Sequence, residues 1–234
     1  MISVIIPTFN EEKTLGQCLR SIKAQNYRSY EVVIVDGGSS DKTLEIVECY
    51  KHKILTLPQR KPHDVGLARN FGARYAEGEI LSFIDADTVL PSDCLNVLDK
   101  YFQNPKVIGV MCKVLPLEGN SIEKTLYECD NVLMNISNKI HIPLLSYFSC
   151  ISYRREPFIK IGGFREDLNA CEDYDLALRL SKHGKMIFTD KITIYTSPRR
   201  LREWTYLGYI ARYFNYLFQY HIFGRIYGYH NAIR

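Results

Sequence analysis

The stretch that decides the fold is Ile80-Leu81-Ser82-Phe83-Ile84-Asp85-Ala86-Asp87, a short apolar run that ends in two aspartates. An apolar run of this length is typical of a strand buried on both faces of a sheet. Asp85 and Asp87 are two positions apart, so in extended backbone their side chains point the same way. Two carboxylates at a strand end suit Mg²⁺ or Mn²⁺, which bind one or two carboxylates together with substrate phosphates. The pattern predicts a divalent-metal site, although Asp-x-Asp alone often occurs by chance.

Three further apolar runs precede this one and alternate with helical patterns. The predicted strands are residues 3–6, 31–35 and 53–57, and the predicted helices are residues 15–22, a segment starting at Ser40, and residues 66–76. This alternation predicts an α/β fold with a mostly parallel, Rossmann-like sheet flanked by helices. In such sheets ligands bind beyond the carboxyl ends of the strands. Functional residues are therefore expected directly after the strands.

The second half of the chain is less regular. Residues 107–115 and 147–153 are predicted strands, and residues 122–136 and 173–183 are predicted helices. Neither a repeat nor a low-complexity linker divides the chain. We expect one domain over residues 1–198 and a C-terminal amphipathic helical extension over residues 199–234.

Composition and charge narrow the class of protein. With 234 residues, 46% of them hydrophobic, the chain can bury a sizeable core. Its seven cysteines lack zinc-site spacing and suggest reduced thiols, and the first residues lack the features of a signal peptide, so a cytoplasmic protein is expected. Residues 195–234 carry a net charge of +5 and the rest −1. Because the body has no basic face, we expect no nucleic-acid partner.

Four polar segments follow the predicted strands or open the third helix. They are Pro7-Thr8-Phe9-Asn10-Glu11-Glu12, Asp36-Gly37-Gly38-Ser39-Ser40-Asp41, Arg69-Asn70 and Asp85-Ala86-Asp87. In a parallel sheet all four gather along one edge. Asp36 either caps the next helix or, if Ser39, Ser40 and Asp41 do so, is free to accept hydrogen bonds from a nucleobase. Arg69 is either a solvated surface residue or a contact to base or phosphate.

Glu172 and Asp173 open the last predicted helix of the domain. A carboxylate at this position is either a helix cap or a general base. The positive end of the helix would lower its pKa, whereas burial beside a bound sugar would raise it. The sequence leaves both roles open.

The chain lacks a Walker A loop and a Gly-x-Gly-x-x-Gly fingerprint, which removes the main support for a kinase or a dehydrogenase. A nucleotidyltransferase also uses paired aspartates, but it would normally have a glycine-rich, basic loop after the first strand, and residues 7–12 contain neither Gly nor Arg. A non-catalytic nucleotide-sugar-binding module is the second alternative. The intact aspartates 36, 85, 87 and 173 argue against it.

Together these segments closely resemble the family-two glycosyltransferases with the GT-A fold. The resemblance covers roughly residues 1–200 and rests on residues 4–11, 35–41, 69–70, 84–87, 162–164 (Gly-Gly-Phe) and 172–173, in order and spacing. It implies an inverting, metal-dependent transfer of a sugar from a nucleoside diphosphate to an acceptor hydroxyl or a lipid-linked acceptor (a hexosyltransferase-like activity of class EC 2.4).

The resemblance also implies roles for single residues. Those implied to bind the nucleotide are Pro7, Thr8, Asn10 and Glu11 around base and ribose, Asp36 at the base, Arg69 beside it, and Asp85 with Ala86 at the ribose. Asp87, with Asp85, is implied to hold Mg²⁺ or Mn²⁺ against the diphosphate. Asp173 is implied to be the general base, with Glu172 beside it.

Three departures from relatives limit this transfer of roles. Val89 stands where lipid-phosphate mannosyl synthases often have Gln, and Tyr195-Thr196-Ser197 lacks the late metal-binding His of many relatives. The third metal ligand therefore stays unidentified. Residues 199–204, Arg-Arg-Leu-Arg-Glu-Trp, differ in spacing from the Gln-x-x-Arg-Trp of processive synthases. Processive synthesis is not expected.

The C-terminal tail, residues 195–234, holds 12 of the chain's 29 aromatic residues. Its apolar positions follow a helical stripe: Leu207, Ile210, Ala211, Phe214, Leu217, Phe218 and Ile222. Polar residues interrupt the stripe, so no apolar span of about 20 residues is available to cross a bilayer. A basic amphipathic helix suits the cytoplasmic membrane surface, where it could meet a lipid-linked acceptor. The alternative is a helix that packs on the enzyme body or on a second copy of the chain in a homodimer.

Overall fold

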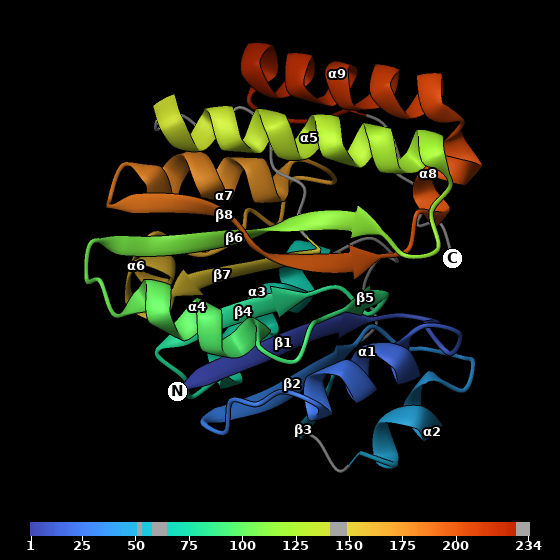
Figure 1. The fold of residues 1–234 in the computed structure, drawn as a ribbon, viewed down its shortest axis with the longest axis vertical. Coiled ribbons are helices and arrows are strands. Elements are labelled where there is room, and N and C mark those ends of the chain that lie inside the picture. Colours follow the sequence, from blue (N-terminus) through green and yellow to red (C-terminus); the bar gives the residue numbers. More distant parts are fainter. Residues whose placement is uncertain (51–52, 58–64, 141–148, 228–234) are drawn as a thin grey trace.

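The computed structural model describes residues 1–50, 53–57, 65–140 and 149–227, in which eight strands form one sheet of order β3-β2-β1-β4-β7-β6-β8-β5 (Figure 1). The strands are β1 (Ile2–Thr8), β2 (Tyr30–Asp36), β3 (Lys53–Thr56), β4 (Ile80–Ile84), β5 (Thr88–Val89), β6 (Val107–Pro116), β7 (Cys150–Arg154) and β8 (Lys185–Thr196). The helices are α1 (Leu15–Lys23), α2 (Thr43–Glu48), α3 (Val65–Tyr75), α4 (Cys94–Phe102), α5 (Ser121–Ile140), α6 (Arg155–Lys160), α7 (Glu172–Ser181), α8 (Arg199–Trp204) and α9 (Tyr206–Phe223).

The predicted mostly parallel, helix-flanked sheet is confirmed. β1 pairs in parallel with β2 and β4, β2 with β3, and β6 with β8, while β7 runs antiparallel between β4 and β6. The two-residue strand β5 runs antiparallel to the end of β8. The predicted strand over residues 147–153 begins outside the described residues, and β7 itself starts at Cys150.

The central strands are buried on both faces because each face carries its own apolar cluster. In β1, Val4 and Ile6 pack with residues of α1 and α4, whereas Ile5 packs on the opposite face with residues of α3, α6 and α7. All three side chains are fully buried. Such continuous apolar runs are characteristic of parallel strands covered on both sides.

The seven cysteines are all free, as expected. Their spacing in the sequence gave no sign of a cluster, yet the sulfur atoms of Cys94, Cys112 and Cys150 lie within 4.8 Å of one another. All three side chains are buried in the apolar cluster beneath α1 and α4. Free cysteine behaves as a small apolar residue in such surroundings, so these thiols are part of the core packing.

The tail forms the predicted helix, α9, but its apolar stripe faces away from the protein. Leu207, Phe214 and Phe218 are 82%, 70% and 61% exposed. The stripe itself therefore does not pack on the enzyme body, whereas the opposite face of α9 does, as the alternative of a body-packed helix expects. Among the described residues, none of the helices combines the length and the apolar character needed to span a membrane.

Tyrosines on the other side of α9 contact the body. Tyr220 donates a hydrogen bond to Asp175 of α7 over 2.9 Å, and Tyr216 is buried in a small apolar cluster with Leu168 and Ala170. Figure 1 shows α9 lying along α5, and the Asn120 amide before α5 donates to the Tyr206 hydroxyl over 3.1 Å. The division into residues 1–198 and 199–234 stays a prediction.

Candidate active site

Parallel pairing gathers the strand-end segments at one edge of the sheet, as predicted. Thr8 at the end of β1 is in register with Asp36 at the end of β2, and Ile5 is in register with Phe83 of β4. The pairing of β5 with β8 adds a segment that the sequence did not place there. It sets Thr196 beside Thr88, and with it the start of α8 beside Asp87.

Arg69 is at the centre of the site. Its guanidinium contacts three carboxylates, at 3.0 Å from Asp85, 2.6 Å from Asp173 and 3.3 Å from Glu172. The Arg69 side chain is only 4% exposed, so it is not the solvated surface residue of the first interpretation. One buried guanidinium thus joins α3, the end of β4 and the start of α7.

The Gly-Gly-Phe loop fixes this arginine in place. The Asn70 side chain accepts a hydrogen bond from the Phe164 backbone N–H over 2.9 Å and donates one to the Phe164 carbonyl over 2.8 Å. The Arg69 guanidinium lies 5.3 Å from the centre of the Phe164 ring, a distance at which a cation and a ring face attract. Gly163 has a φ of +67°, and a Cβ there would come within 2.4 Å of the Asn70 Oδ1 atom. The loop motif therefore depends on glycine at this position.

Burial decides the acidity of Asp173. Its position at the start of α7 and its contact with Arg69 favour the charged form, but burial and the nearby carboxylates Glu172 and Asp85 raise its pKa well above the ordinary value. Arg69 is shared among three carboxylates and cannot neutralise all of them. A raised pKa makes the ionised form a stronger base.

Asp87 and Glu11 share a second arginine. The Arg199 guanidinium contacts both oxygens of Glu11 and lies 3.3 Å from the Asp87 carboxylate. The Thr196 hydroxyl donates to the other Asp87 oxygen over 3.2 Å. Burial raises the pKa of Asp87 to about 6, with Arg199 acting in the opposite direction. Sequence reasoning did not assign Arg199 or Thr196 to the site, because only the pairing of β8 with β5 brings them there.

The residues predicted to bind the nucleotide form a connected turn around Asp36. The Asn10 Oδ1 atom accepts from the Ser40 backbone N–H over 2.8 Å, while Thr8 is 4% exposed. The argument that Asp36 is free is wrong for this structure. Its carboxylate is buried and accepts hydrogen bonds from the Gly38 and Ser39 backbone N–H groups and from the hydroxyls of Ser39 and Thr8. Asp41 instead accepts from the Thr43 backbone N–H at the start of α2, over 3.0 Å.

The charges of the site suit a divalent cation. Five carboxylates (Glu11, Asp85, Asp87, Glu172 and Asp173) face the guanidinium groups of Arg69, Arg199 and the neighbouring Arg200. With every group ionised, two negative charges remain in excess. Asp85 is the most accessible of the carboxylates that touch Arg69, with 35% of its side chain exposed. Hard oxygen donors with a surplus of negative charge are the ligand set that Mg²⁺ and Mn²⁺ prefer.

Comparison with known proteins identifies the family. Residues 3–162 match the family model described as glycosyl transferase family 2. The chain belongs to this family. The match covers the strand-end segments from β1 to the Gly-Gly-Phe loop, and membership removes the support for the nucleotidyltransferase alternative.

Relatives within the family are longer than this chain. An uncharacterized glycosyltransferase of Haemophilus influenzae is 29% identical over 191 residues, which are 77% of this chain and 62% of the relative. TarS of Staphylococcus aureus, a poly(ribitol-phosphate) β-N-acetylglucosaminyltransferase, is 27% identical over 84% of this chain and 35% of its own length. The dolichyl N-acetyl-α-D-glucosaminyl phosphate 3-β-D-2,3-diacetamido-2,3-dideoxy-β-D-glucuronosyltransferase of Methanococcus voltae is 31% identical over 81% of this chain and 64% of its own length.

Solved structures of two glycosyltransferases have the same GT-A fold as this chain. Residues 1–349 of S. aureus TarS superpose with a TM-score of 0.70 at 24% identity, covering 89% of this chain and 64% of that one. The mannosyltransferase PcManGT of Pyrobaculum calidifontis, in complex with GDP-Man and Mn²⁺, superposes with a TM-score of 0.70 at 23% identity, covering 91% of this chain and 64% of that one. These likenesses support the fold.

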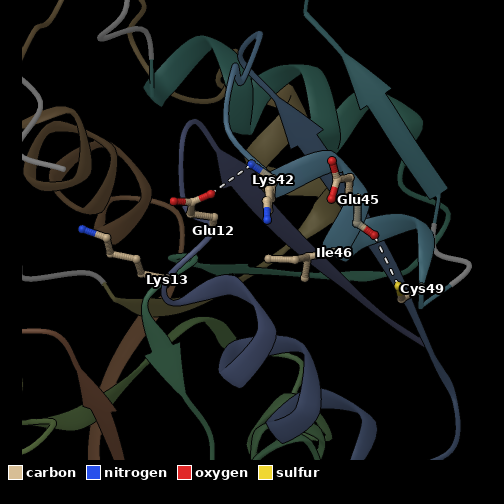
Figure 2. A pocket seen from close by; sticks show the side chains of 6 residues that line it. All are labelled: Glu12, Lys13, Lys42, Glu45, Ile46 and Cys49. Atoms are coloured by element: carbon tan, nitrogen blue, oxygen red, sulfur yellow. Dashed lines mark hydrogen bonds between the residues drawn. The ribbon is translucent and has the colours of Figure 1, made fainter.

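A groove lies between the segment after β1 and α2. It has a volume of about 520 Å³ and is lined by Glu12, Lys13, Lys42, Glu45, Ile46 and Cys49. Figure 2 shows Glu12 bonded to the Lys42 backbone while Lys13 points away from it. None of the carboxylates that contact Arg69 lines the groove. The reaction is therefore to be sought at the sheet edge.

Proposed function

We propose that this chain is an inverting, metal-dependent glycosyltransferase that moves a sugar from a nucleoside diphosphate to an acceptor hydroxyl. The observation that carries the proposal is the Arg69 cluster, which places Asp85 and Asp173 on one guanidinium. A proposed metal ligand and a candidate base thus contact the two terminal nitrogens of a single guanidinium. Family membership supports the same reaction class.

The donor would bind along the edge formed by β1, β2 and β4. Pro7, Thr8, Asn10 and Glu11 are proposed to surround the base and ribose, and Asp36 supports this loop through its hydrogen bonds to the turn after β2. Ala86 keeps the backbone between the two aspartates in the core, at 4% exposure. Asp85 and Asp87 would hold Mg²⁺ or Mn²⁺. When bound, the metal would offset negative charge on the leaving diphosphate.

Asp173 is proposed to take the proton of the acceptor hydroxyl. Its raised pKa suits this task, because a general base works best when its pKa approaches the working pH. Arg69 would orient the carboxylate from one side and leave the other to the acceptor. The acceptor oxygen would then attack the anomeric carbon from the face opposite the diphosphate, which inverts the configuration.

The metal assignment predicts the behaviour of Asp87→Asn. This variant keeps the size of the side chain and removes its charge, so Mn²⁺ should no longer raise the melting temperature in the presence of UDP or GDP. Differential scanning fluorimetry with and without Mn²⁺ measures the effect. The matched control is Asp93→Asn, an exposed aspartate just before α4, which should respond like wild type. An unchanged Mn²⁺-dependent shift in Asp87→Asn would contradict the assignment.

The base assignment predicts that Asp173→Asn binds donor normally but loses transfer by about 10²-fold or more. Asparagine can still accept the hydrogen bond from Arg69, so the fold should survive. Glu172→Gln is the matched control, because Glu172 contacts the same guanidinium at 3.3 Å. Release of nucleoside diphosphate from a donor sugar is the readout. Near-normal turnover of Asp173→Asn together with a large loss in Glu172→Gln would move the role to Glu172.

The exposed stripe of α9 is proposed to dock on the cytoplasmic face of a membrane. Phe214, Phe218 and Ile222 project from the protein at 61–70% exposure, and Arg212 of α9 and Arg225 just after it are also exposed. Basic residues near an anionic lipid surface contribute about 1 kcal/mol each. Apolar burial would add a part that salt does not screen. Such docking would bring the site to a lipid-linked acceptor, a class that fits the Methanococcus voltae relative, whose name includes a dolichyl phosphate-linked sugar.

Co-sedimentation with anionic vesicles tests this docking. Wild type should bind, and binding should weaken without vanishing at high salt. Phe214→Glu with Phe218→Glu should abolish it and leave nucleotide binding intact, because both side chains are exposed. Asn215→Glu, which adds a carboxylate beside the stripe, should have a much smaller effect than Phe214→Glu alone. If wild type ignores vesicles and the double variant instead breaks a dimer, the stripe is a contact between copies of the chain.

A further inference from the structure

The three arginines of α8 differ in their partners. Arg199 pairs with Glu11 and Asp87, and Arg202 pairs with Glu123 at 2.7 Å. Arg200, by contrast, has no carboxylate within 4 Å among the residues that the structure describes. Its guanidinium donates to the Tyr213 hydroxyl over 3.3 Å and lies 5.9 Å from the centre of the Trp204 ring. These contacts orient the group without neutralising its charge.

Arg200 is nevertheless near the reacting groups, because it directly follows Arg199, whose guanidinium lies 3.3 Å from Asp87. Its charge acts on the pKa of both Asp87 and Asp173, in each case against the raising effect of burial. Arg69 and Arg199 also act on these carboxylates, but each of them is already bound to two or more acidic side chains. The Arg200 side chain is exposed. It therefore presents an accessible positive charge near the two aspartates.

A second arginine lies on the same aromatic ring. The guanidinium of Arg212, in α9, is 4.8 Å from the centre of the Trp204 ring. Arg212 is exposed, and within the described part of the chain it too has no carboxylate within 4 Å. Two cations near one indole repel each other, and an anion that contacts both would relieve this repulsion. Guanidinium groups bind phosphate oxygens through paired N–H donors, which makes phosphate the anion that best fits this pair.

The elements around this pair contact both the donor edge and α7, because Arg200 follows Arg199, which contacts Asp87. Trp204, Tyr213 and Arg212 come from α8 and α9, and α9 rests on α7, the helix that begins with Glu172 and Asp173. The contacts are the hydrogen bond from Tyr220 to Asp175 and a 3.1 Å hydrogen bond between Tyr174 and His221. The donor diphosphate is proposed to lie at the edge that carries Asp85 and Asp87. Arg212 belongs to α9, which rests on α7, so a phosphate that contacts both Arg200 and Arg212 would enter with the acceptor.

We infer that Arg200 and Arg212, held on the Trp204 ring, bind a phosphate group of the acceptor substrate. The inference rests on the proposed glycosyl transfer and specifies its acceptor as a phosphate-bearing molecule. The phosphate belongs either to a polyprenyl phosphate, whose chain would run along the exposed stripe of α9, or to a phosphodiester-linked polyol. In both cases the two arginines select the acceptor, whereas Asp173 activates its hydroxyl.

Titration calorimetry on protein saturated with UDP or GDP and Mn²⁺ tests the inference, because the nucleotide already fills the donor site. One arm compares farnesyl phosphate with farnesol, and the other compares ribitol 5-phosphate with ribitol. In one of these two comparisons, the phosphate compound should bind at least about tenfold more tightly than the matching alcohol. This difference is the scale of one charge-assisted hydrogen bond. Arg200→Gln and Arg212→Gln should each lose that preference while keeping the nucleotide affinity of wild type.

The control variant is Arg225→Gln, which removes the same charge from the tail but contacts Tyr227 instead of Trp204. It should keep the phosphate preference, and circular dichroism should verify that all variants are folded. Equal binding of phosphate and non-phosphate forms by wild type, or no binding of any of them, overturns the inference. A loss of nucleotide affinity in Arg200→Gln also overturns it and assigns Arg200 to the donor. If wild type fails to bind nucleotide with Mn²⁺, the proposed function itself is wrong.

Discussion

The arrangement of the site depends on one buried ion-pair cluster, in which Arg69 holds Asp85, Glu172 and Asp173. Asp85 is 16 residues from Arg69 in the sequence, whereas Glu172 and Asp173 are 103 and 104 residues away, and the guanidinium joins all three. Burying an arginine is costly unless it is paired, and removing one partner of a buried pair typically costs about 3–5 kcal/mol. The cluster therefore holds α3 against the start of α7. It also sets the spacing between Asp85 and Asp173.

The same cluster explains how two aspartates in one site can differ in function. Asp85 is partly exposed and belongs to the side where the donor would bind, while Asp173 has a raised pKa despite its contact with Arg69. An excess of carboxylates over arginines keeps the donor side attractive to a cation. Arg199 bridges Glu11 and Asp87 and thereby ties the loop after β1 to the segment after β4. The segments proposed to bind the nucleotide and the metal are thus linked by Arg199 before any ligand binds.

Much of this could be predicted from the sequence, because parallel strands carry their polar ends to one edge. The apolar runs before Asp36 and Asp85 were sufficient to place both residues there. The contacts of Arg69 with Glu172 and Asp173 could not be predicted, since no local pattern links positions 103 and 104 residues apart. The environment of Asp36 was misjudged for a local reason. Its carboxylate closes the turn after β2 instead of remaining free for a base.

The tail shows that helical periodicity in the sequence does not predict how a helix is oriented on the protein. A helical stripe from Leu207 to Ile222 identifies one face of α9 but not the side to which that face turns. The orientation of α9 is set by its tyrosines, because Tyr213 and Tyr220 can turn their rings inward while their hydroxyls form hydrogen bonds with Arg200 and Asp175. The apolar stripe consequently faces away from the protein. The partners of Arg199 were equally hidden, as they depend on the pairing of two residues of β5 with the end of β8.

The central claim is that Asp173 activates the attacking oxygen on the face opposite the diphosphate. The most direct test follows the slow hydrolysis of an α-linked nucleotide sugar by proton NMR, with water as the acceptor. The anomeric proton of the first sugar released should be that of the β-anomer, before mutarotation mixes the two forms. Initial release of the α-anomer, at a rate that depends on this protein, would contradict the account.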